Sequence, residues 1–361
     1  FRNDLHADEV HLAEILKANG YTTWLHGDQH ETRDPARLGF DHIDNPFFGE
    51  GTADGFARQM AAYDGKQPFF AEICFFEPHR GGDIFPKADD IEPLPEGSMP
   101  LPPYLPDLPV LRHDFAAFEA SIATLDRAVG RVLDAVRKAG VWDDTLIVFT
   151  ADHGIPFPLA KMTLSDAGLE VPLIVRIPGG KSGVRSPAVF SNIDFTPSVL
   201  ELLGIGHPGP KPLHGVPRGA VLRGEDPTGA DEVFAEKTFH TYYDPMRCIR
   251  RDGWKLIANF ERAPGHEIPI DFGNNARGYP ETIEALGVEA YHPPFELYDL
   301  ANDPHERTNL AGDENHAEKL ADLQARLLAW MRETEDPLLE GPIPSAAFRH
   351  RMGALLDAAE A

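Results

Sequence analysis

The sequence has very little cysteine and a shortage of positive charge. Its 361 residues include only Cys74 and Cys248, which excludes a disulfide framework and a thiolate zinc cluster and leaves a single bridge open. Lys and Arg number 33 against 58 Asp and Glu, for a formal net charge of -25. This balance argues against general nucleic-acid binding and against a basic membrane surface. An anionic substrate therefore has to be attracted by a local group of cations or by a metal ion.

Long apolar runs are also missing, since none approaches the roughly 18 to 20 residues that a membrane span needs. The chain opens with Phe1-Arg-Asn and has neither an initiator methionine nor a charged and apolar leader. We therefore expect that a signal was removed or that the sequence starts inside a longer protein.

A content of 42% hydrophobic and 25% charged residues is typical of a globular, soluble protein, and the length allows one large α/β domain or two ordinary ones.

Apolar periodicity predicts helices that alternate with buried strands. The predicted helices cover residues 7–20, 112–138, 196–204 and a last segment from Leu320 to Met331, and the predicted strands cover 21–26, 68–76, 145–150, 171–177, 232–239 and 246–260. In the third helix, Thr196 is expected as the N-cap and Pro197 as the first helical residue. Prolines crowd residues 93–109, which predicts an ordered crossing without regular structure.

This alternation predicts an α/β fold with a mostly parallel sheet sandwiched between helices. A stretch rich in Gly and Pro, residues 204–229, marks a boundary. We therefore predict a catalytic domain over residues 1–230 and a smaller C-terminal α+β subdomain over residues 231–361. The subdomain would contain an antiparallel sheet and the terminal helix.

Acids and histidines follow three of the predicted strands. Asp152-His153 comes after the strand 145–150, Glu77-Pro-His-Arg80 comes after the strand 68–76, and Leu25-His-Gly-Asp-Gln-His30 follows a third. Ligands of open α/β sheets bind beyond the carboxyl ends of the strands, so these three segments are candidates for one site. Each also has a simpler interpretation as turn chemistry, and for an isolated Asp-His-Gly that interpretation is the better one.

Together these residue types point to metal-assisted hydrolysis of an anionic ester or amide. Carboxylate oxygens suit a hard cation such as calcium or magnesium, and an imidazole can complete a metal site or give a proton to a leaving group. Lys161, which follows His153 in the same segment, is a candidate to pair with an anionic substrate group. Its alternative is a solvated loop lysine.

Two long segments resemble the sulfatases. Residues 149–178, FTADHGIPFPLAKMTLSDAGLEVPLIVRIP, are similar to the family's segment that carries a strand, a metal-binding pair, a basic residue and a Val-Pro-Leu-Ile strand. Residues 296–310, ELYDLANDPHERTNL, resemble its C-terminal signature. The resemblance spans essentially the whole chain, and it implies an alkaline-phosphatase-like α/β fold and hydrolysis of a sulfate ester or sulfamate.

Three features resemble the heparan N-sulfatase (sulfamidase) branch of that family. They are the run Ile155-Pro-Phe-Pro after Asp-His, the segment Tyr243-Asp-Pro-Met-Arg-Cys-Ile-Arg250 and the segment Trp330-Met-Arg-Glu-Thr-Glu-Asp-Pro337. The resemblance implies a sulfated saccharide or an aryl sulfate as substrate. It also implies a periplasmic, lysosomal or secreted location, and a homodimer is one assembly to consider.

Site roles can be carried over from the resemblance one position at a time. Asp152 and His153 resemble two calcium ligands, with magnesium as the second choice of metal. His79 resembles the histidine that contacts the sulfate and helps to protonate the leaving atom, and Lys161 resembles the basic residue that binds sulfate. Arg80, His240 and Arg247 are candidates for substrate contacts; for His240 and Arg247, structural roles are equally consistent with the sequence.

The chain departs from the family pattern at two places. His30 matches the histidine of the family's Gly-Lys-x-His segment, but Asp28 stands where the lysine would be. The family nucleophile is a formylglycine that a maturation enzyme makes from the cysteine or serine of a Cys-x-Pro-Ser-Arg motif, and neither Cys74 nor Cys248 lies in such a motif. We therefore expect the nucleophile and two metal aspartates to lie upstream of residue 1.

Two alternatives to a sulfatase stay open. The first is a phosphatase or phosphonate monoester hydrolase of the same superfamily, because the fold does not determine which group is transferred. The second is an inactive fragment or a non-catalytic protein that binds sulfated sugars, which Asp28 and the missing nucleophile favour.

Overall fold

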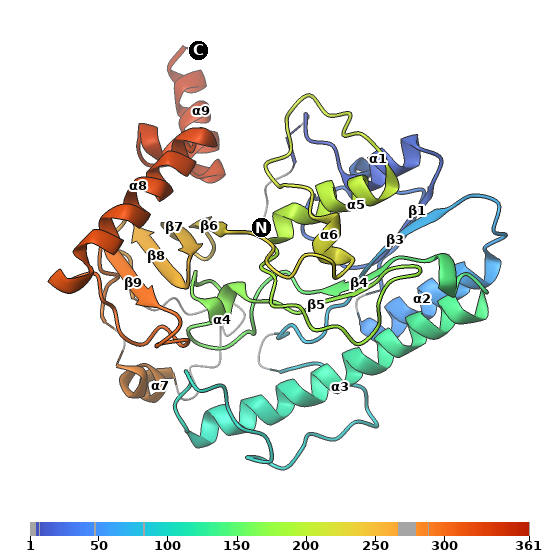
Figure 1. Cartoon of the computed structure of the whole chain (residues 1–361), viewed down its shortest axis with the longest axis horizontal. Coiled ribbons are helices and arrows are strands. Elements are labelled where there is room, and N and C mark those ends of the chain that lie inside the picture. The colour runs from blue at the N-terminus through green and yellow to red at the C-terminus, as the bar shows by residue number, and fades with distance from the viewer. Residues whose placement is uncertain are drawn as a thin grey trace. The chain divides into compact units, whose positions relative to one another are not determined.

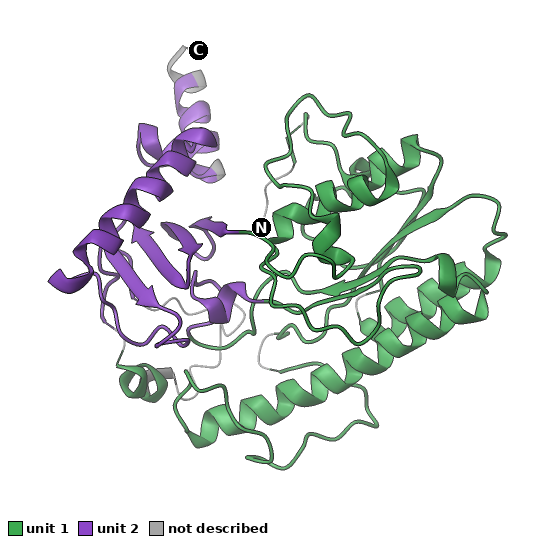
Figure 2. Cartoon of the chain, viewed as in Figure 1, with its two compact units in different colours: residues 1–158, 171–230, 268–287 green, residues 159–170, 231–267, 288–361 purple. Residues whose placement is uncertain are grey.

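The computed structural model of the chain (Figure 1) describes residues 5–6, 8–46, 48–81, 84–265, 279–287 and 289–360. The chain divides into two compact units (Figure 2). Unit 1 comprises residues 1–158, 171–230 and 268–287, and unit 2 comprises residues 159–170, 231–267 and 288–361. The predicted division into a catalytic domain and a C-terminal subdomain stays a prediction. None of the described helices is long and apolar enough to cross a membrane.

Unit 1 contains a parallel sheet of three strands in the order β2 (His42–Asp44), β1 (Thr22–Gly27) and β3 (Phe69–Cys74). Helices cover both of its faces. Trp24 and Phe69 pack towards α2 (Gly49–Ala62) and α3 (Pro109–Lys138), whereas Phe70 packs towards α1 (Leu12–Ala18) and α5 (Phe195–Leu203). This alternation of side chains along buried strands confirms the predicted α/β sandwich.

A second pair of strands in unit 1, β4 (Ile147–Thr150) and β5 (Leu173–Arg176), is antiparallel. Both strands were predicted, but their apolar composition does not encode their relative direction. The short helix α6 (Gly219–Leu222) and helix α7 (Tyr279–Leu286) complete the regular elements of this unit. Both cysteines of the chain are free thiols, so the bridge that the sequence left open is not formed.

Two helix starts differ from the prediction. Helix α5 begins at Phe195 rather than at Pro197, so Thr196 lies inside its first turn and is not the N-cap. The carboxylate of Asp194, the residue before the helix, does not cap it either. It accepts hydrogen bonds from the backbone N of Val216 (2.8 Å) and from Nε of Arg218 (2.9 Å). Helix α3 begins at Pro109, where a missing N–H costs nothing.

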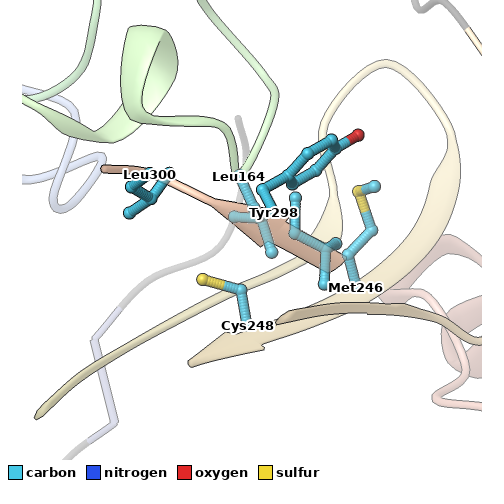
Figure 3. Packing of buried hydrophobic residues seen from close by; sticks show 6 residues of the cluster. Leu164, Met246, Cys248, Tyr298 and Leu300 are labelled. Carbon is cyan, nitrogen blue, oxygen red and sulfur yellow. The ribbon is translucent and has the colours of Figure 1, made fainter. Parts of the chain in front are cut away.

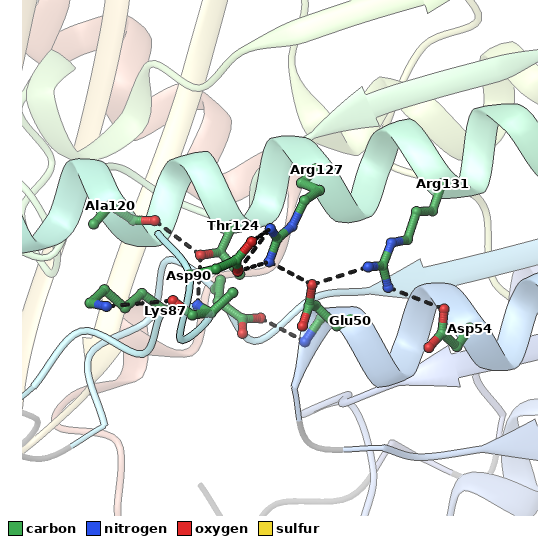
Figure 4. A network of polar contacts seen from close by, with 11 residues as sticks. Glu50, Asp54, Lys87, Asp90, Ala120, Thr124, Arg127 and Arg131 are labelled. Atoms are coloured by element: carbon green, nitrogen blue, oxygen red, sulfur yellow. Dashed lines mark hydrogen bonds and ion pairs between the residues drawn. The ribbon is translucent and has the colours of Figure 1, made fainter. Parts of the chain in front are cut away.

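Charged side chains fasten α2 to α3 (Figure 4). Arg127 of α3 donates to Glu50 of α2 at 2.7 Å and to Asp90 at 2.8 Å, and Arg131 pairs with Asp54 at 3.2 Å. Beneath them, Phe56 and other apolar residues of α2 are buried against the end of α3. Helix α3 was predicted from the sequence, whereas α2 was not.

Unit 2 is built on an antiparallel sheet in the order β6 (Glu232–Phe239), β7 (Tyr243–Arg251), β8 (Trp254–Asn259) and β9 (Phe295–Asp299). Helix α8 (Ala317–Glu333) packs its Leu323 and Leu327 on one face of this sheet. The chain reverses between β7 and β8 at Asp252 (φ 53°) and Gly253 (φ 75°), a pair that suits a tight hairpin turn. Helices α4 (Asp166–Leu169) and α9 (Ala346–Glu360) complete the unit.

Candidate active site

The loop after β3 is anchored to α2 by a buried carboxylate. Glu77 accepts a hydrogen bond from the backbone N of Gly49, the first residue of α2, at 2.8 Å from Oε2. A Cβ at residue 49 would lie only 2.7 Å from the same oxygen, so the close approach requires glycine. The positive end of the helix favours a carboxylate at this position, although burial raises the pKa of Glu77.

Arg80 anchors the other end of this short loop. Its side chain is 1% exposed, its Nη2 donates to Asp114 Oδ2 on α3 at 2.9 Å, and its guanidinium lies 4.2 Å from the ring centroid of Phe85. His79 therefore lies between two fixed residues of this loop, since Glu77 is bound to α2 and Arg80 is bound to α3. The ion pair gives Arg80 a structural role, and its substrate contact stays a prediction.

The carboxyl ends of β1 and β3 lie side by side. Gly27 pairs with Cys74 in the register, and a Cβ on Gly27 would lie 1.8 Å from the carbonyl oxygen of Cys74. Because the strands are parallel, the segments that carry Asp28 and His79 leave the same edge of the sheet. His30 Nε2 lies 3.4 Å from Asp28 Oδ2, so the acid at the place of the family lysine lies beside this histidine.

Asp152 and His153 follow β4 directly and face one another. The backbone N of His153 donates to Asp152 Oδ1 at 3.0 Å, and His153 Nε2 lies 3.4 Å from Asp152 Oδ2. His153 Nδ1 lies 2.8 Å from the carbonyl oxygen of Gly154, which only accepts, so Nδ1 carries the proton. The lone pair of Nε2 is then on the side of the carboxylate, and both groups can bind one cation.

The pair fits a part of a hard-cation site. Calcium takes six to eight oxygen-rich ligands, and Asp152 with His153 offers two carboxylate oxygens and one imidazole nitrogen. The Asp152 side chain is 85% exposed, which leaves its oxygens accessible to an ion. Further ligands would have to come from other groups.

Lys161 lies in unit 2, in a segment that is tightly fixed. Its side chain is 7% exposed, and three residues later Leu164 enters a buried apolar cluster with Met246, Cys248, Ile257, Tyr298 and Leu300 (Figure 3). Thr163 Oγ1 donates to the carbonyl oxygen of Ala160 at 2.9 Å, which stabilises the turn beside the lysine. The structure thus rules out the solvated loop lysine that the sequence left as the alternative.

Lys255 joins the two long sequence motifs within unit 2. This fully buried lysine contacts Asp166 of the first motif and Glu306 of the second, the latter at 2.6 Å, and donates to the carbonyl oxygen of Leu164 at 3.2 Å. Glu306 also accepts from the backbone N of Asp166 at 2.6 Å. Lys255 could not be identified from the sequence, because a single lysine on a strand carries no signal that it is buried between two carboxylates.

Arg247 and His240 also lie in unit 2. Arg247 is 1% exposed, and its Nε and Nη2 donate to the two carboxylate oxygens of Asp336 at 2.5 and 3.0 Å. This pair joins two of the sulfamidase-like segments and gives Arg247 the structural role that the sequence left open. His240 is half-buried after β6, with Nδ1 3.1 Å from Thr241 Oγ1.

Neither cysteine has the surroundings of a nucleophile. Burial raises the pKa of Cys248 to about 12, and burial with the nearby Glu72 raises the pKa of Cys74 above its ordinary value. Both are therefore protonated thiols at neutral pH. This agrees with the absence of a formylglycine motif around either residue.

The sulfatase family model matches residues 2–205, more than half of the chain. The chain belongs to the sulfatase family. This sulfatase is 31% identical over 324 residues to the human N-sulphoglucosamine sulphohydrolase, a match that covers 79% of the chain and 64% of the human protein. The chain thus spans less than two thirds of the length of this relative.

Solved structures confirm the alkaline-phosphatase-like fold of this sulfatase. A 2-O GAG sulfatase superposes with a TM-score of 0.68 at 22% identity and covers 95% of this chain and 80% of its own. A phosphonate monoester hydrolase from Silicibacter pomeroyi superposes with a TM-score of 0.63 at 21% identity and covers 91% of this chain and 81% of its own. At these identities the likeness concerns the fold alone.

Proposed function

We propose that this chain forms part of a hydrolase for sulfate esters or sulfamates, with a sulfated saccharide or an aryl sulfate as the substrate. The observation that carries the proposal is the Asp152–His153 pair, whose hydrogen bond to Gly154 orients Nε2 towards the carboxylate. Membership of the sulfatase family and the similarity to the human sulphohydrolase support it.

In this proposal, Asp152 and His153 hold part of a calcium site, with magnesium as the second choice. A bound divalent cation would stabilise the negative charge that develops on the sulfate group. Lys161 would bind a sulfate oxygen through its ammonium group. Its buried and well-packed surroundings would hold that charge in one position and strengthen its attraction for an anion.

His79 would protonate the leaving oxygen or nitrogen. Its position would be well defined, because Glu77 and Arg80 hold its loop against α2 and α3. His30 is the second candidate for this proton transfer, and its Nε2 lies 3.4 Å from Asp28 Oδ2. Arg80, His240 and Arg247 stay candidates for substrate contacts, although Arg80 and Arg247 are engaged in buried ion pairs. The nucleophile would be a formylglycine outside these residues.

The test compares kcat/KM of the complete protein, supplied with calcium and the maturation enzyme, on matched aryl sulfate, N-sulfoglucosamine, aryl phosphate and phosphonate monoester substrates. We expect the highest value on a sulfate ester or the sulfamate. A preference for phosphate or phosphonate would replace the proposal with the phosphatase alternative. Binding of sulfated sugars without turnover of any substrate would identify a non-catalytic protein.

A further inference from the structure

Three side chains that can bind a metal, and that have no part in the proposed hydrolysis, lie on one face of the parallel sheet in unit 1. His26 belongs to β1, and His42 and Asp44 belong to β2. The register pairs His26 with Asp44 and Trp24 with His42. Because alternate residues of a strand share a face, all three candidate ligands point the same way, towards α2. One ligand atom from each lies within 4.8 Å of the other two.

His26 is fully buried, and among the described residues neither of its ring nitrogens has a hydrogen-bond partner. Buried polar atoms are almost always paired, because an unpaired one loses its interaction with water. Nδ1 lies 3.9 Å from Asp44 Oδ2, which is too long for a hydrogen bond. The ring of Phe56 packs edge-on against His26 and offers no acceptor. A nitrogen lone pair is therefore left inside the cluster.

Gly55 keeps the space beside these residues open. A Cβ at this position of α2 would lie 2.4 Å from Asp44 Oδ2 and 3.3 Å from His26 Nδ1. Glycine inside a helix lowers helix stability relative to alanine, so its presence in the middle of α2 needs a local reason. The space that the Asp44 carboxylate occupies next to His26 provides one.

We propose that His26, His42 and Asp44 bind a divalent transition-metal ion of the zinc class, at a site separate from the Asp152–His153 pair. Two imidazoles and one carboxylate form a nitrogen-rich donor set that suits zinc, whereas calcium and magnesium prefer oxygens. Three protein ligands leave a fourth tetrahedral position for water.

The dimensions of the cluster agree with such a site. Bonds of the usual zinc length place neighbouring ligand atoms about 3.3 Å apart. The distance of 3.9 Å between His26 Nδ1 and Asp44 Oδ2 therefore needs only a small side-chain rotation. Asp44 is 35% exposed, so an ion can enter from solvent.

Charge around the cluster also permits a cation. Asp44 places a carboxylate beside the two imidazoles, and its negative charge favours a bound cation. Arg58 Nη2 lies 3.6 Å from Asp44 Oδ2 and would compete with the ion. Its side chain is 72% exposed and can turn into solvent when the metal binds. The ion would stabilise the pairing of the three-residue strand β2 with β1, because its ligands come from both strands.

The test is a titration of the zinc-free chain with zinc chloride by isothermal calorimetry, in the presence of millimolar calcium. We expect one zinc ion per chain, a rise in the thermal unfolding midpoint with zinc, and the absorption of tetrahedral cobalt when cobalt replaces zinc. Asp44→Asn and His42→Ala should each weaken zinc binding about 100-fold or more and remove the rise in midpoint. His26→Gln is a weaker test, because His26 is buried and the variant risks misfolding.

The control is a second cluster of possible metal ligands, formed by one histidine and two glutamates: His11, Glu31 and Glu72. There His11 Nε2 lies 3.2 Å from Glu31 Oε2, and His11 Nδ1 accepts a hydrogen bond from the backbone N of Ala13, so the histidine is already satisfied. Glu31→Gln should leave zinc binding unchanged. The proposal is overturned if no stoichiometric zinc binds, if Asp44→Asn and His42→Ala bind like the parent chain, or if Glu31→Gln abolishes binding.

Discussion

Asp152 and Asp166 belong to the same sulfatase-like segment but have opposite surroundings. Asp152 is 85% exposed in unit 1, and its carboxylate contacts the backbone and the ring of the neighbouring His153. Asp166 lies in unit 2 in contact with the buried Lys255, and its Oδ2 lies 3.5 Å from Arg250 Nε. The carboxylate of Asp166, which protein cations bind, anchors the chain, whereas the carboxylate of Asp152 is open to solvent and available for an ion.

The largest effect is expected when Asp166 loses the buried cation that anchors it. Lys255→Met removes the buried cation between Asp166 and Glu306, so that Glu306 loses this charge partner and Asp166 keeps only the longer contact with Arg250. We expect the free energy of unfolding to fall by about 3 to 5 kcal/mol, as for other buried ion pairs that lose one member. Urea denaturation followed by circular dichroism measures this.

The matched control for Lys255 is Lys66→Met, which removes an exposed pair with Asp64. It should leave the urea midpoint unchanged. Equal destabilisation by both variants would show that the Lys255 network is not an anchor.

The exposed side of the comparison should respond in activity instead of stability. In the complete protein, Asp152→Asn removes one charged ligand of the proposed calcium site, and we expect kcat/KM to fall about 100-fold, or about 2.7 kcal/mol. The thermal midpoint in the absence of calcium should not change, because the side chain has few partners. Steady-state kinetics measures the change in kcat/KM, and calorimetry measures the thermal midpoint.

Asp143→Asn provides the comparison, since Asp143 is also exposed and precedes the same strand β4. It should retain full activity. If Asp152→Asn destabilised the protein and left kcat/KM intact, Asp152 would be a structural residue like Asp166.

The pair Arg247–Asp336 extends the comparison to acid pH. Burial alone would raise the pKa of Asp336, but hydrogen bonds from Arg247 and from the backbone N of Leu338 outweigh it and lower the pKa below its ordinary value of 3.8. The unfolded chain then takes up this proton first as the pH falls. The pair's contribution is therefore complete above about pH 4 to 5 and is lost below it.

We expect this loss to amount to about 1.5 to 3 kcal/mol, the typical contribution of a hydrogen bond to a charged group. Urea denaturation between pH 6 and pH 3 should show a smaller pH dependence for Asp336→Asn than for the parent chain. An identical pH dependence in both proteins would contradict the assignment.

The smallest effect is expected at the charged contacts between α2 and α3. Arg131→Gln removes partly exposed ion pairs with Asp54 and Glu50, and the buried packing of Phe56 remains. We expect the thermal midpoint to fall by roughly 2 °C or less in low salt and not at all in 1 M salt, because salt screens exposed charges. A large, salt-independent drop would place Arg131 with the buried pairs of unit 2.

Most of the long elements could be predicted because their apolar periodicity is local. Helix α2 was missed because Gly49, Gly51 and Gly55 count against a helix, and packing of Phe56 and Met60 outweighs that low propensity. Strand β2 was missed because three residues carry no measurable period. Thr196 was wrongly expected as an N-cap, since its helix begins one residue earlier, at Phe195.

The positions of the candidate site residues after strands could be predicted from the sequence, but their burial and their ion-pair partners could not. The sequence placed Asp152, His153, His79 and His30 after strands, and the structure bears out these positions. The sequence could not show that Arg80 forms an ion pair with Asp114 and Arg247 with Asp336, because those acids lie far from the arginines along the chain. The metal and substrate roles of all these residues stay predictions.

The sequence by itself determined the family, the alternation of helices with strands and the Asp-His pair at the end of β4. Only the tertiary structure decided that Asp166 is anchored while Asp152 is open, and that His26 meets His42 and Asp44 on one face of the sheet. The physical reason is that periodicity and turn chemistry act between near neighbours. Burial and ion pairing depend instead on strand register and packing between residues that are distant in the sequence.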